Sequence, residues 1–472
     1  MATANPPSSR AYRAIWRWHF YAGLFVAPFL LILSVTGAIY LFNDEIDDAL
    51  HPGLRFVAPR AVPQPPSHLV RAALAAHPGT ATRIDLPATP GRTAVVFVTP
   101  AAGAPVRVAV DPGTARVLGA FVYTRTLVGL ADTVHGSLML GSWGAIVMEL
   151  AACWALVLIA TGLYLWWPRG RRLAGILYPR LSAGGRLFWR DLHATTGVWT
   201  IALIAFLLLT GLPWAQVEGP LLQRATSRLG IGYPASHAVD HAPSSIPAKA
   251  ALGEAPWTME GAPMPASAPL PAGPGHAGHA GAGGAVDAAA IAGLDRVATA
   301  LARDHGLSGG YRLFPPAGPT GVYTAYTYPD RPQGQRSLYF DRYSGRLIRE
   351  VGFADYGAAA QAIELGVQLH MGNYFGRANQ IVMLLACVAI VLLVVSGITM
   401  WWQRRPAGQL AAPPRAPGAP VRGAVALLAA AALLFPVLGV SAAAVWALDL
   451  LARRIRTARR PPARHGCSGA RG

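Results

Sequence analysis

Apolar residues are gathered into long runs, and four of these runs are long enough to cross a lipid bilayer. A transmembrane helix needs about 20 mainly apolar residues. The four runs occupy approximately 20–42, 143–167, 196–214 and 378–402. A fifth apolar stretch covers about 423–450 and has Pro436 near its middle. A single kinked helix is favoured over a re-entrant or kinked hairpin, which would keep the basic tail in the cytoplasm but has two short halves. The pattern predicts a mainly α-helical membrane protein.

The four runs form two pairs, and the second pair repeats the spacing of the first. In the first and third runs a histidine is followed, at equal offsets, by a glycine and a Thr-Gly dipeptide: His19, Gly23 and Thr36-Gly37, then His193, Gly197 and Thr210-Gly211. In the second and fourth runs a histidine is followed by two glycines and a Trp pair: His135, Gly141, Gly162 and Trp166-Trp167, then His370, Gly376, Gly397 and Trp401-Trp402. The spacing predicts a four-helix transmembrane core built from two repeated helix pairs.

The segments between the paired runs repeat as well, and they predict two small α+β modules. Segments 106–120 and 336–350 alternate apolar and polar residues around an Asp-Pro-Gly or Asp-Arg-Tyr-Ser-Gly turn, which is typical of a β-hairpin. An apolar-periodic stretch before each hairpin, at about 67–77 and 287–305, predicts a helix. Segment 234–286 is rich in Pro, Ala and Gly, so we expect a flexible insert there.

The distribution of charge predicts the orientation of the bundle. The formal net charge is +18, and the arginines gather before the first run, between the second and third, and after the fourth. Short loops rich in Arg stay in the cytoplasm, so we expect a cytoplasmic N-terminus. The same clustering argues against a nucleic-acid-binding protein, the obvious alternative for so basic a chain.

These patterns predict the order of segments along the chain. The expected membrane and cytoplasmic segments are an N-terminus at 1–18, transmembrane segments at 19–42, 131–167, 193–214 and 366–402, a loop at 168–192, a linker at 403–421, a C-terminal hydrophobic segment at 422–452 and a basic tail at 453–472. The two outer modules are expected at 43–130 and 215–365, and the second contains the flexible insert.

The four helix-borne histidines are the leading candidates for function. An ionisable residue in a membrane span is a functional-site hypothesis by default, and matched depths predict that His19 faces His193 and that His135 faces His370. Two histidines are too few for a tetrahedral zinc site, but they suit a haem iron, whose other ligands come from the porphyrin. The sequence has no C-x-x-C-H motif, so we expect two non-covalent b-type haems, each with two axial histidines.

Helix length predicts that the outer pair lies near the outer surface. His135 and Trp167 are 32 residues apart, which is about 48 Å in one continuous helix, whereas the apolar core of a bilayer is about 30 Å thick. We expect Gly23 and Gly197, one turn after their histidines, either to leave room for a macrocycle or to allow close helix packing.

Other polar residues have less specific interpretations. Asp132 and Asp191 precede candidate ligands, and we expect them to cap helix N-termini rather than to orient an imidazole. Glu149 lies in the second run without a counterpart and either relays protons or pairs with a polar neighbour. Four histidines of the insert have a spacing that allows loose metal chelation, although a solvated linker is favoured: His237, His241, His276 and His279.

Several of these motifs resemble one family. The second run ends Thr-Gly-Leu-Tyr-Leu-Trp-Trp, the fourth ends Ser-Gly-Ile-Thr-Met-Trp-Trp, and the first hairpin turns at Asp-Pro-Gly-Thr. These motifs resemble the PepSY-associated transmembrane family, also called iron-regulated membrane proteins, over about residues 10–405. The outer modules would then be PepSY-like and periplasmic, although the Pro/Gly-rich insert departs from the family's pattern.

The resemblance implies a di-haem protein of the bacterial inner membrane that reduces ferric-siderophore iron on the periplasmic side. The expected partners are membrane lipid, a ferric siderophore as substrate, and quinol or a redox protein as electron donor. The sequence has no flavin or nicotinamide fingerprint and no paired-carboxylate constellation, so no catalytic residue besides the haem ligands is predicted. Two alternatives stay open: a non-catalytic PepSY protein that binds or regulates a partner, and an electron-transfer subunit of another reductase.

Overall fold

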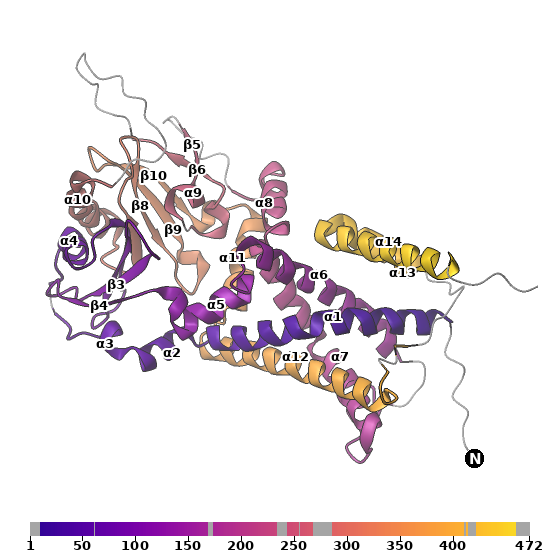
Figure 1. Ribbon diagram of the computed structural model, residues 1–472. Coiled ribbons are helices and arrows are strands. Elements are labelled where there is room, and N and C mark those ends of the chain that lie inside the picture. The colour runs from indigo at the N-terminus through magenta and orange to yellow at the C-terminus, as the bar shows by residue number, and fades with distance from the viewer. Residues whose placement is uncertain are drawn as a thin grey trace, which may run out of the picture.

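The computed structural model describes residues 10–60, 62–168, 173–233, 243–253, 255–267, 286–409, 412–413 and 422–458. These residues form a bundle of long helices with a β-sheet domain at one end (Figure 1). The N-terminal end of the first helix lies at the opposite end of the bundle from the sheet.

Four helices are long and apolar enough to cross a membrane, as the hydropathy pattern predicted. They are α1 (Arg10–Tyr40), α6 (Gly141–Trp166), α7 (Gly185–Gly211) and α12 (Arg377–Arg404). Helices α1 and α7 each pack against both α6 and α12. Small and branched side chains fill the centre: Val26, Ala155, Ile204, Leu208 and Ile390. Many other apolar side chains of the bundle point outward, as expected for helices that face lipid.

The second and fourth predicted spans are broken near the ends that lie next to the sheet, so the expectation of one continuous helix is wrong. The second divides into α5 (Leu127–Ser137) and α6, and the fourth divides into α11 (Ala358–His370) and α12. Residues at the two breaks have positive φ angles: Leu138, Met139, Gly141, Gly372 and Gly376. Because a left-handed residue ends an α-helix, the two outer histidines lie on short helices of their own.

One eight-stranded antiparallel sheet is built from both outer segments. Its strands are β1 (Thr80–Leu86), β2 (Ala94–Thr99), β3 (Val106–Val110), β4 (Val117–Phe121), β7 (Tyr311–Phe314), β8 (Val322–Thr327), β9 (Arg336–Asp341) and β10 (Leu347–Gly352). Their order is β10-β9-β8-β7-β1-β2-β3-β4. The two outer segments therefore share one sheet, which is joined where β1 pairs with β7.

Two helices cover the face of the sheet that is turned away from the bundle (Figure 1). They are α4 (Pro66–Ala76) and α10 (Ala288–His305), close to the predicted ranges. Their apolar sides bury Leu69, Leu294 and Leu301 against strand residues such as Val96 and Leu338. This core depends on both outer segments, because α4 and α10 also contact each other.

The two predicted hairpins are confirmed as β3–β4 and β9–β10. In the first turn the Asp111 carboxylate accepts a hydrogen bond from the Gly113 amide at 2.8 Å. In the second turn the Asp341 carboxylate accepts from the amides of Tyr343 and Ser344 at 3.0 and 2.7 Å. An aspartate that bonds the backbone two residues on is typical of a turn.

The described part of the insert at 234–286 is packed, which corrects the expectation that this whole segment is flexible. It forms β5 (Pro243–Pro247), α9 (Ala248–Leu252) and β6 (Pro263–Pro265), and β5 pairs with β6. Its buried Ala248, Met259 and Met264 join an apolar cluster with residues of the sheet domain. His237, His241, His276 and His279 lie outside the described residues.

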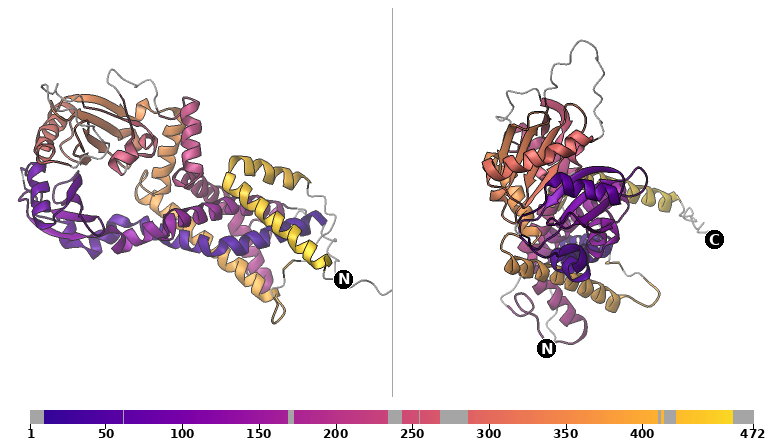
Figure 2. Two further views of the ribbon diagram at one scale, coloured as in Figure 1. Left: turned by 45° about the horizontal axis from the view of Figure 1, so that its top comes forward. Right: turned by 90° about the vertical axis from the view of Figure 1, so that its left-hand side faces the viewer.

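The C-terminal hydrophobic segment is not one kinked helix. It forms α13 (Arg422–Leu434) and α14 (Pro436–Ala458), which meet at Phe435 as a V-shaped hairpin (Figure 2). Leu438 is buried against the outside of the bundle near Cys153 and Leu212. Proline at the start of α14 interrupts the helical hydrogen bonds, which explains why the direction reverses there. Shorter helices α2 (Asn43–Leu50), α3 (Pro52–Arg55) and α8 (Glu218–Arg228) connect the bundle to the sheet.

Replacing a core side chain of the sheet domain is expected to destabilise it. Leu294 of α10 is fully buried, so Leu294→Ala should cost about 2–5 kcal/mol and lower the temperature of the thermal unfolding transition of the detergent-solubilised protein. The matched control is Leu347→Ala on β10, where the side chain is 41% exposed. Equal unfolding temperatures for the two variants would contradict this packing.

Candidate functional site

His19 of α1 and His193 of α7 face each other inside the bundle. Their ring centroids are 6.4 Å apart and their ring planes are perpendicular, at 90°. Metal–imidazole nitrogen bonds are about 2 Å long, so this separation leaves room for one metal ion bound by a nitrogen of each ring. The structure thus brings together the first two histidines singled out in the sequence.

The other two histidines lie on the short helices, at the end of the bundle next to the sheet, here called the outer end. His135 is near the end of α5, and His370 is the last residue of α11. Burial lowers the pKa of His135 to about 4. Burial, together with the neighbouring His135, lowers the pKa of His370 to about 4. Both imidazoles are therefore neutral at pH 7, which is the form that binds a metal ion.

Each of the four imidazole rings is held by the same kind of hydrogen bond, from Nδ1 to a hydroxyl group. The Nδ1 atom lies 2.8 to 3.0 Å from a hydroxyl oxygen of another helix. The pairs are His19 with Thr161, His135 with Thr36, His193 with Ser396, and His370 with Thr210. Each hydroxyl belongs to a Leu-x-x-Ser/Thr-Gly sequence, and the carbonyl of its leucine is also near Nδ1: Leu158, Leu33, Leu393 and Leu207.

These contacts determine which ring nitrogen carries the hydrogen. Each hydroxyl lies within 2.6 to 2.7 Å of the carbonyl oxygen four residues earlier and donates to it. Its oxygen must then accept the hydrogen bond from the imidazole, so Nδ1 is the protonated nitrogen. The lone pair of the neutral ring consequently lies on Nε2, the atom available to a metal.

Sequence reasoning found the four histidines but missed their hydroxyl partners. Thr36 and Thr210 were used only to define the repeat, and the equivalent roles of Thr161 and Ser396 were not recognised. The signal was present, because Leu-x-x-Ser/Thr-Gly occurs once in every span, at Leu33, Leu158, Leu207 and Leu393.

The glycine of each such sequence lies beside a histidine ring. A Cβ atom at Gly162 would be 3.3 Å from Cε1 of His19, and one at Gly37 would be 3.4 Å from Cε1 of His135. The equivalent distances are 3.5 Å for Gly397 with His193 and 3.8 Å for Gly211 with His370. Any larger side chain there would fill the space next to the rings.

Gly23 and Gly197 have different neighbours. A Cβ atom at either position would meet only a leucine of the neighbouring helix, Leu158 at 3.8 Å or Leu393 at 3.6 Å. These are ordinary van der Waals distances, so both uses of these glycines, room for a macrocycle and close helix packing, stay predictions.

Two of the three acidic residues singled out in the sequence lie elsewhere than expected. Asp132 and Asp191 are inside α5 and α7, so the expectation that they cap helix N-termini is wrong. Asp132 accepts a hydrogen bond from the Tyr123 hydroxyl at 3.1 Å, and the buried Asp191 pairs with Arg180 at 2.6 Å. Glu149 accepts hydrogen bonds from backbone amides at the start of α8, so it pairs with a polar neighbour.

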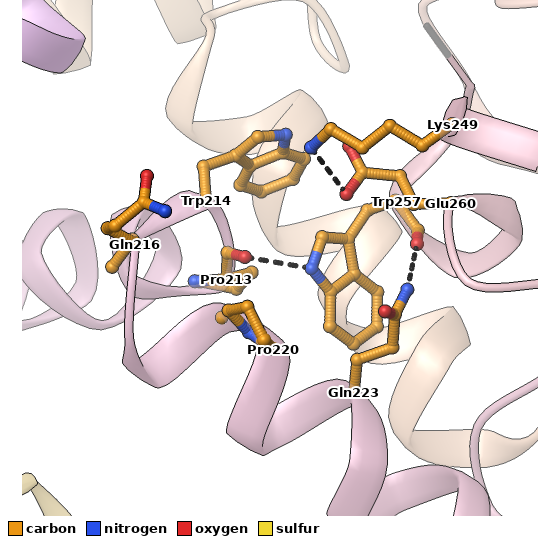
Figure 3. A pocket seen from close by; sticks show the side chains of 10 residues that line it. Pro213, Trp214, Gln216, Pro220, Gln223, Lys249, Trp257 and Glu260 are labelled. Atoms are coloured by element: carbon orange, nitrogen blue, oxygen red, sulfur yellow. Dashed lines mark hydrogen bonds and ion pairs between the residues drawn. The ribbon is translucent and has the colours of Figure 1, made fainter. Parts of the chain in front are cut away.

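A small cavity of about 120 Å³ lies near the outer end of α7 (Figure 3). Trp214, Trp257 and the ion pair of Lys249 with Glu260 line it, and the Trp257 indole donates to the Pro213 carbonyl at 2.9 Å. A cavity of about 150 Å³ holds one benzene ring. This cavity is smaller than that, so it has no room for a metal chelate.

A larger, apolar cavity of about 470 Å³ lies between α1, α2 and α12. Val35, Ala38 and Val388 are among its lining residues, and Cys387 of the lining is also close to Gly37, which faces His135. The cavity thus lies close to the site of His135. An apolar lining of this size suits a hydrophobic ring system or chain rather than an ion.

The donor set fits a metal that needs only two protein ligands per centre. Among the residues that the structure describes, no group of three or more His, Cys, Asp or Glu side chains is placed to hold a metal ion. Two imidazoles whose Nε2 atoms are unprotonated can supply the two axial ligands of a haem iron. The glycines beside the rings are compatible with such a group.

The fold and the histidine sites define a membrane protein with four apolar helices and an antiparallel sheet domain at one end. The chain belongs to the family described as the PepSY-associated TM region, which matches residues 16–404. The resemblance seen in the spans is therefore confirmed. No curated protein matches the chain.

The hydrogen bonds at Nδ1 predict the tautomer of all four histidines. In the haem-free protein at neutral pH, ¹⁵N NMR of labelled histidine should show Nδ1 protonated and Nε2 unprotonated for these four rings. Substituting each histidine in turn by alanine assigns its signals. A protonated Nε2 on any of the four would contradict the arrangement. The exposed His68 of α4 supplies the reference spectrum of a solvated ring.

Proposed function

We propose that this protein is a di-haem electron-transfer protein of the bacterial inner membrane that reduces ferric-siderophore iron on its periplasmic side. The observation that carries the proposal is the fourfold histidine site. His19 and His193 face each other, His135 and His370 lie within electrostatic reach at the other end of the bundle, and each ring has its Nδ1 held by a neighbouring helix so that Nε2 is available to iron.

His19 and His193 would hold the inner haem, and His135 and His370 would hold the outer one. When bound, a haem supplies a one-electron carrier. The chain's own contribution is to fix the ring orientation through hydroxyl and carbonyl acceptors, which raises the basicity of the ligand. The glycines beside the rings keep the adjacent space free of side chains.

The distance between the two sites suits electron transfer across a membrane. On α1, 17 residues separate His19 of the inner site from Thr36, which holds His135 of the outer site. At 1.5 Å per residue this is a rise of about 25 Å, comparable to the apolar thickness of a bilayer of about 30 Å. The two centres would therefore lie near opposite faces of the membrane.

The positions of the short helices α5 and α11 support the proposal that the outer pair passes electrons to the iron chelate. Both bring their histidines to the end of the bundle that carries the sheet domain (Figure 1). Because the sequence has no flavin or nicotinamide fingerprint, electrons would come from quinol or from a redox protein. The siderophore as acceptor rests on the family resemblance.

Spectroscopy of the purified full-length protein tests the haem sites. We expect reduced-minus-oxidised spectra and a haem assay to show two b-type haems per chain. His193→Ala should remove axial ligation of one haem, and His370→Ala should affect the other, because each pair is expected to bind its own iron. His68→Ala, at an exposed position of α4, is the control and should leave both haems unchanged.

Two outcomes would overturn the assignment. One is an absence of haem from well-folded protein, which would favour a PepSY protein that binds or regulates a partner. The other is equal loss of both haems in either single variant while thermal unfolding stays unchanged.

Anaerobic mixing of the reduced protein with a ferric chelate tests the proposed reaction. We expect each haem to be reoxidised by transfer of one electron to iron(III), and the iron(II) formed to be trapped by a ferrous chelator. His370→Ala should slow this reoxidation more than His193→Ala in a single-turnover measurement, since the outer centre would donate to the chelate. Haems that stay reduced with every ferric chelate would point to an electron-transfer subunit of another reductase.

A further inference from the structure

The apolar cavity between α1, α2 and α12 contains one polar group that has no partner. The cavity has a volume of about 470 Å³, and apart from Ser34 and Cys387 its lining residues are apolar. Ser34 is 3% exposed, and its hydroxyl oxygen has no hydrogen-bond partner among the residues that the structure describes. Because a buried hydroxyl without a partner is costly, the cavity favours a ligand that offers Ser34 a hydrogen bond.

The cavity opens toward the lipid. Val35 of α1 and Val388 of α12 line it, and both side chains are exposed on the outside of the bundle. Among the described residues that line it, none is charged, so a charged ligand would lose its hydration without compensation. A ligand of this cavity is therefore an uncharged molecule that dissolves in the membrane.

The cavity lies on a different side of α1 from the hydroxyl that holds His135. Ser34 and Ala38 of the lining are four residues apart, so they share one face of the helix. Thr36, which bonds His135, is two residues from each of them and lies about 160° round the helix. The cavity is thus distinct from the place where Thr36 meets the imidazole.

Short contacts nevertheless connect the cavity to the His135 ring. Cys387 of the lining lies 3.9 Å from the position that a Cβ atom would take at Gly37, and that position is 3.4 Å from Cε1 of His135. An electron donor in the cavity would therefore lie close to the outer pair.

The equivalent gap in the other half of the bundle is filled by the protein's own chain. At the offsets of the sequence repeat, Ala38 and Val388 of the cavity correspond to Leu212 and Cys153. These two residues pack against the buried Leu438 of α14. The C-terminal hairpin thus covers the gap beside α6 and α7, whereas the described residues leave the matching gap between α1 and α12 open.

These features match the chemistry of a quinol. Its ring carries two hydroxyl groups that can exchange hydrogen bonds with a serine, the molecule is uncharged, and its hydrocarbon tail dissolves in lipid. A ligand cavity of this volume has room for such a ring. A lipid acyl chain would also fill the space, but it would leave Ser34 without a partner.

We propose that this cavity binds the ring of a membrane quinol, with Ser34 as the hydrogen-bond partner of a ring oxygen and the hydrocarbon tail in the lipid. The inference rests on the proposed function for the use of the electrons, and it selects quinol rather than a redox protein as their donor. Oxidation of one quinol to the quinone releases two electrons, one for each of two haem centres, and two protons, which pass to water at the membrane surface.

Photolabelling locates the site without using electron transfer. The full-length protein in lipid nanodiscs is irradiated with an azido-ubiquinone that has a decyl tail, and the labelled peptides are identified by mass spectrometry. We expect label within 34–46 and 384–391, which contain the lining residues, and we expect excess decyl-ubiquinone to suppress it. Decylbenzene, which has the same tail and a ring without oxygen atoms, should not compete.

Two substitutions test the lining, each with a matched control. Ser34→Ala removes one hydrogen bond, so about fivefold more decyl-ubiquinone should be needed to halve the labelling. Its control is Thr399→Ala, which removes a hydroxyl that bonds within α12. Ala38→Phe places a ring in the cavity and should abolish the labelling there, whereas Leu24→Phe, at an exposed position of the same helix, should label as the parent does.

Other results would overturn the inference. Label spread over all the lipid-facing helices, or equal competition by decylbenzene, would show that the cavity holds lipid tails. Labelling that occurs only in haem-free protein would show that the cavity is part of the space for the macrocycle. A Ser34→Ala variant that needs no more decyl-ubiquinone than the parent would contradict the assigned hydrogen bond.

The two proposals fail in different ways. A protein that is labelled at the cavity but contains no haem would refute the proposed electron transfer and keep the quinol site. A protein with two haems that is not labelled there, and whose haems decyl-ubiquinol does not reduce, would refute the site and leave a redox protein as the donor.

Discussion

The hydrogen bond from a buried imidazole to a hydroxyl of a neighbouring helix is the contact on which the arrangement of the bundle depends. A polar ring inside an apolar bundle is costly unless its N–H finds an acceptor. His19 of α1 finds Thr161 of α6, and His135 of α5 finds Thr36 of α1. These two bonds join α1 to α5 and α6 at two levels.

The second half of the bundle is held in the same way. His193 of α7 bonds to Ser396 of α12, and Thr210 of α7 bonds to His370 of α11. These hydrogen bonds thus join helices within one half of the bundle. His19 and His193, by contrast, come from different halves and face each other. A metal bound by both imidazoles would connect the two halves.

The breaks between α5 and α6, and between α11 and α12, connect the membrane part to the sheet. Each break turns a short helix away from the long one, and the short helix carries the outer histidine. Glu364 of α11 is fully buried and accepts hydrogen bonds from Thr258 at 3.0 and 2.9 Å and from Gln335 at 3.2 Å. Its pKa is raised because burial disfavours the carboxylate. The same short helix thus joins the outer histidine to the interior of the sheet domain.

The amino-acid sequence by itself determined the four spans, the four histidines and the two hairpins. Hydropathy over 20 residues and a polar residue in an apolar run are local signals, and Asp111 and Asp341 mark turns by their own side-chain chemistry. The Leu-x-x-Ser/Thr-Gly pattern was visible in the sequence. Which histidine each of its hydroxyl groups bonds was not, because partners such as Thr36 and His135 are 99 residues apart.

Only the tertiary structure decided the rest. It showed that the second and fourth spans are broken. Hydropathy could not predict these breaks, because it does not reveal which residues, such as Leu138, adopt a left-handed conformation. It merged two expected modules into one sheet, since the pairing of β1 with β7 joins residues more than 200 positions apart. It also enclosed the apolar cavity with residues of α1, α2 and α12, because helix packing, and not sequence distance, determines which side chains meet.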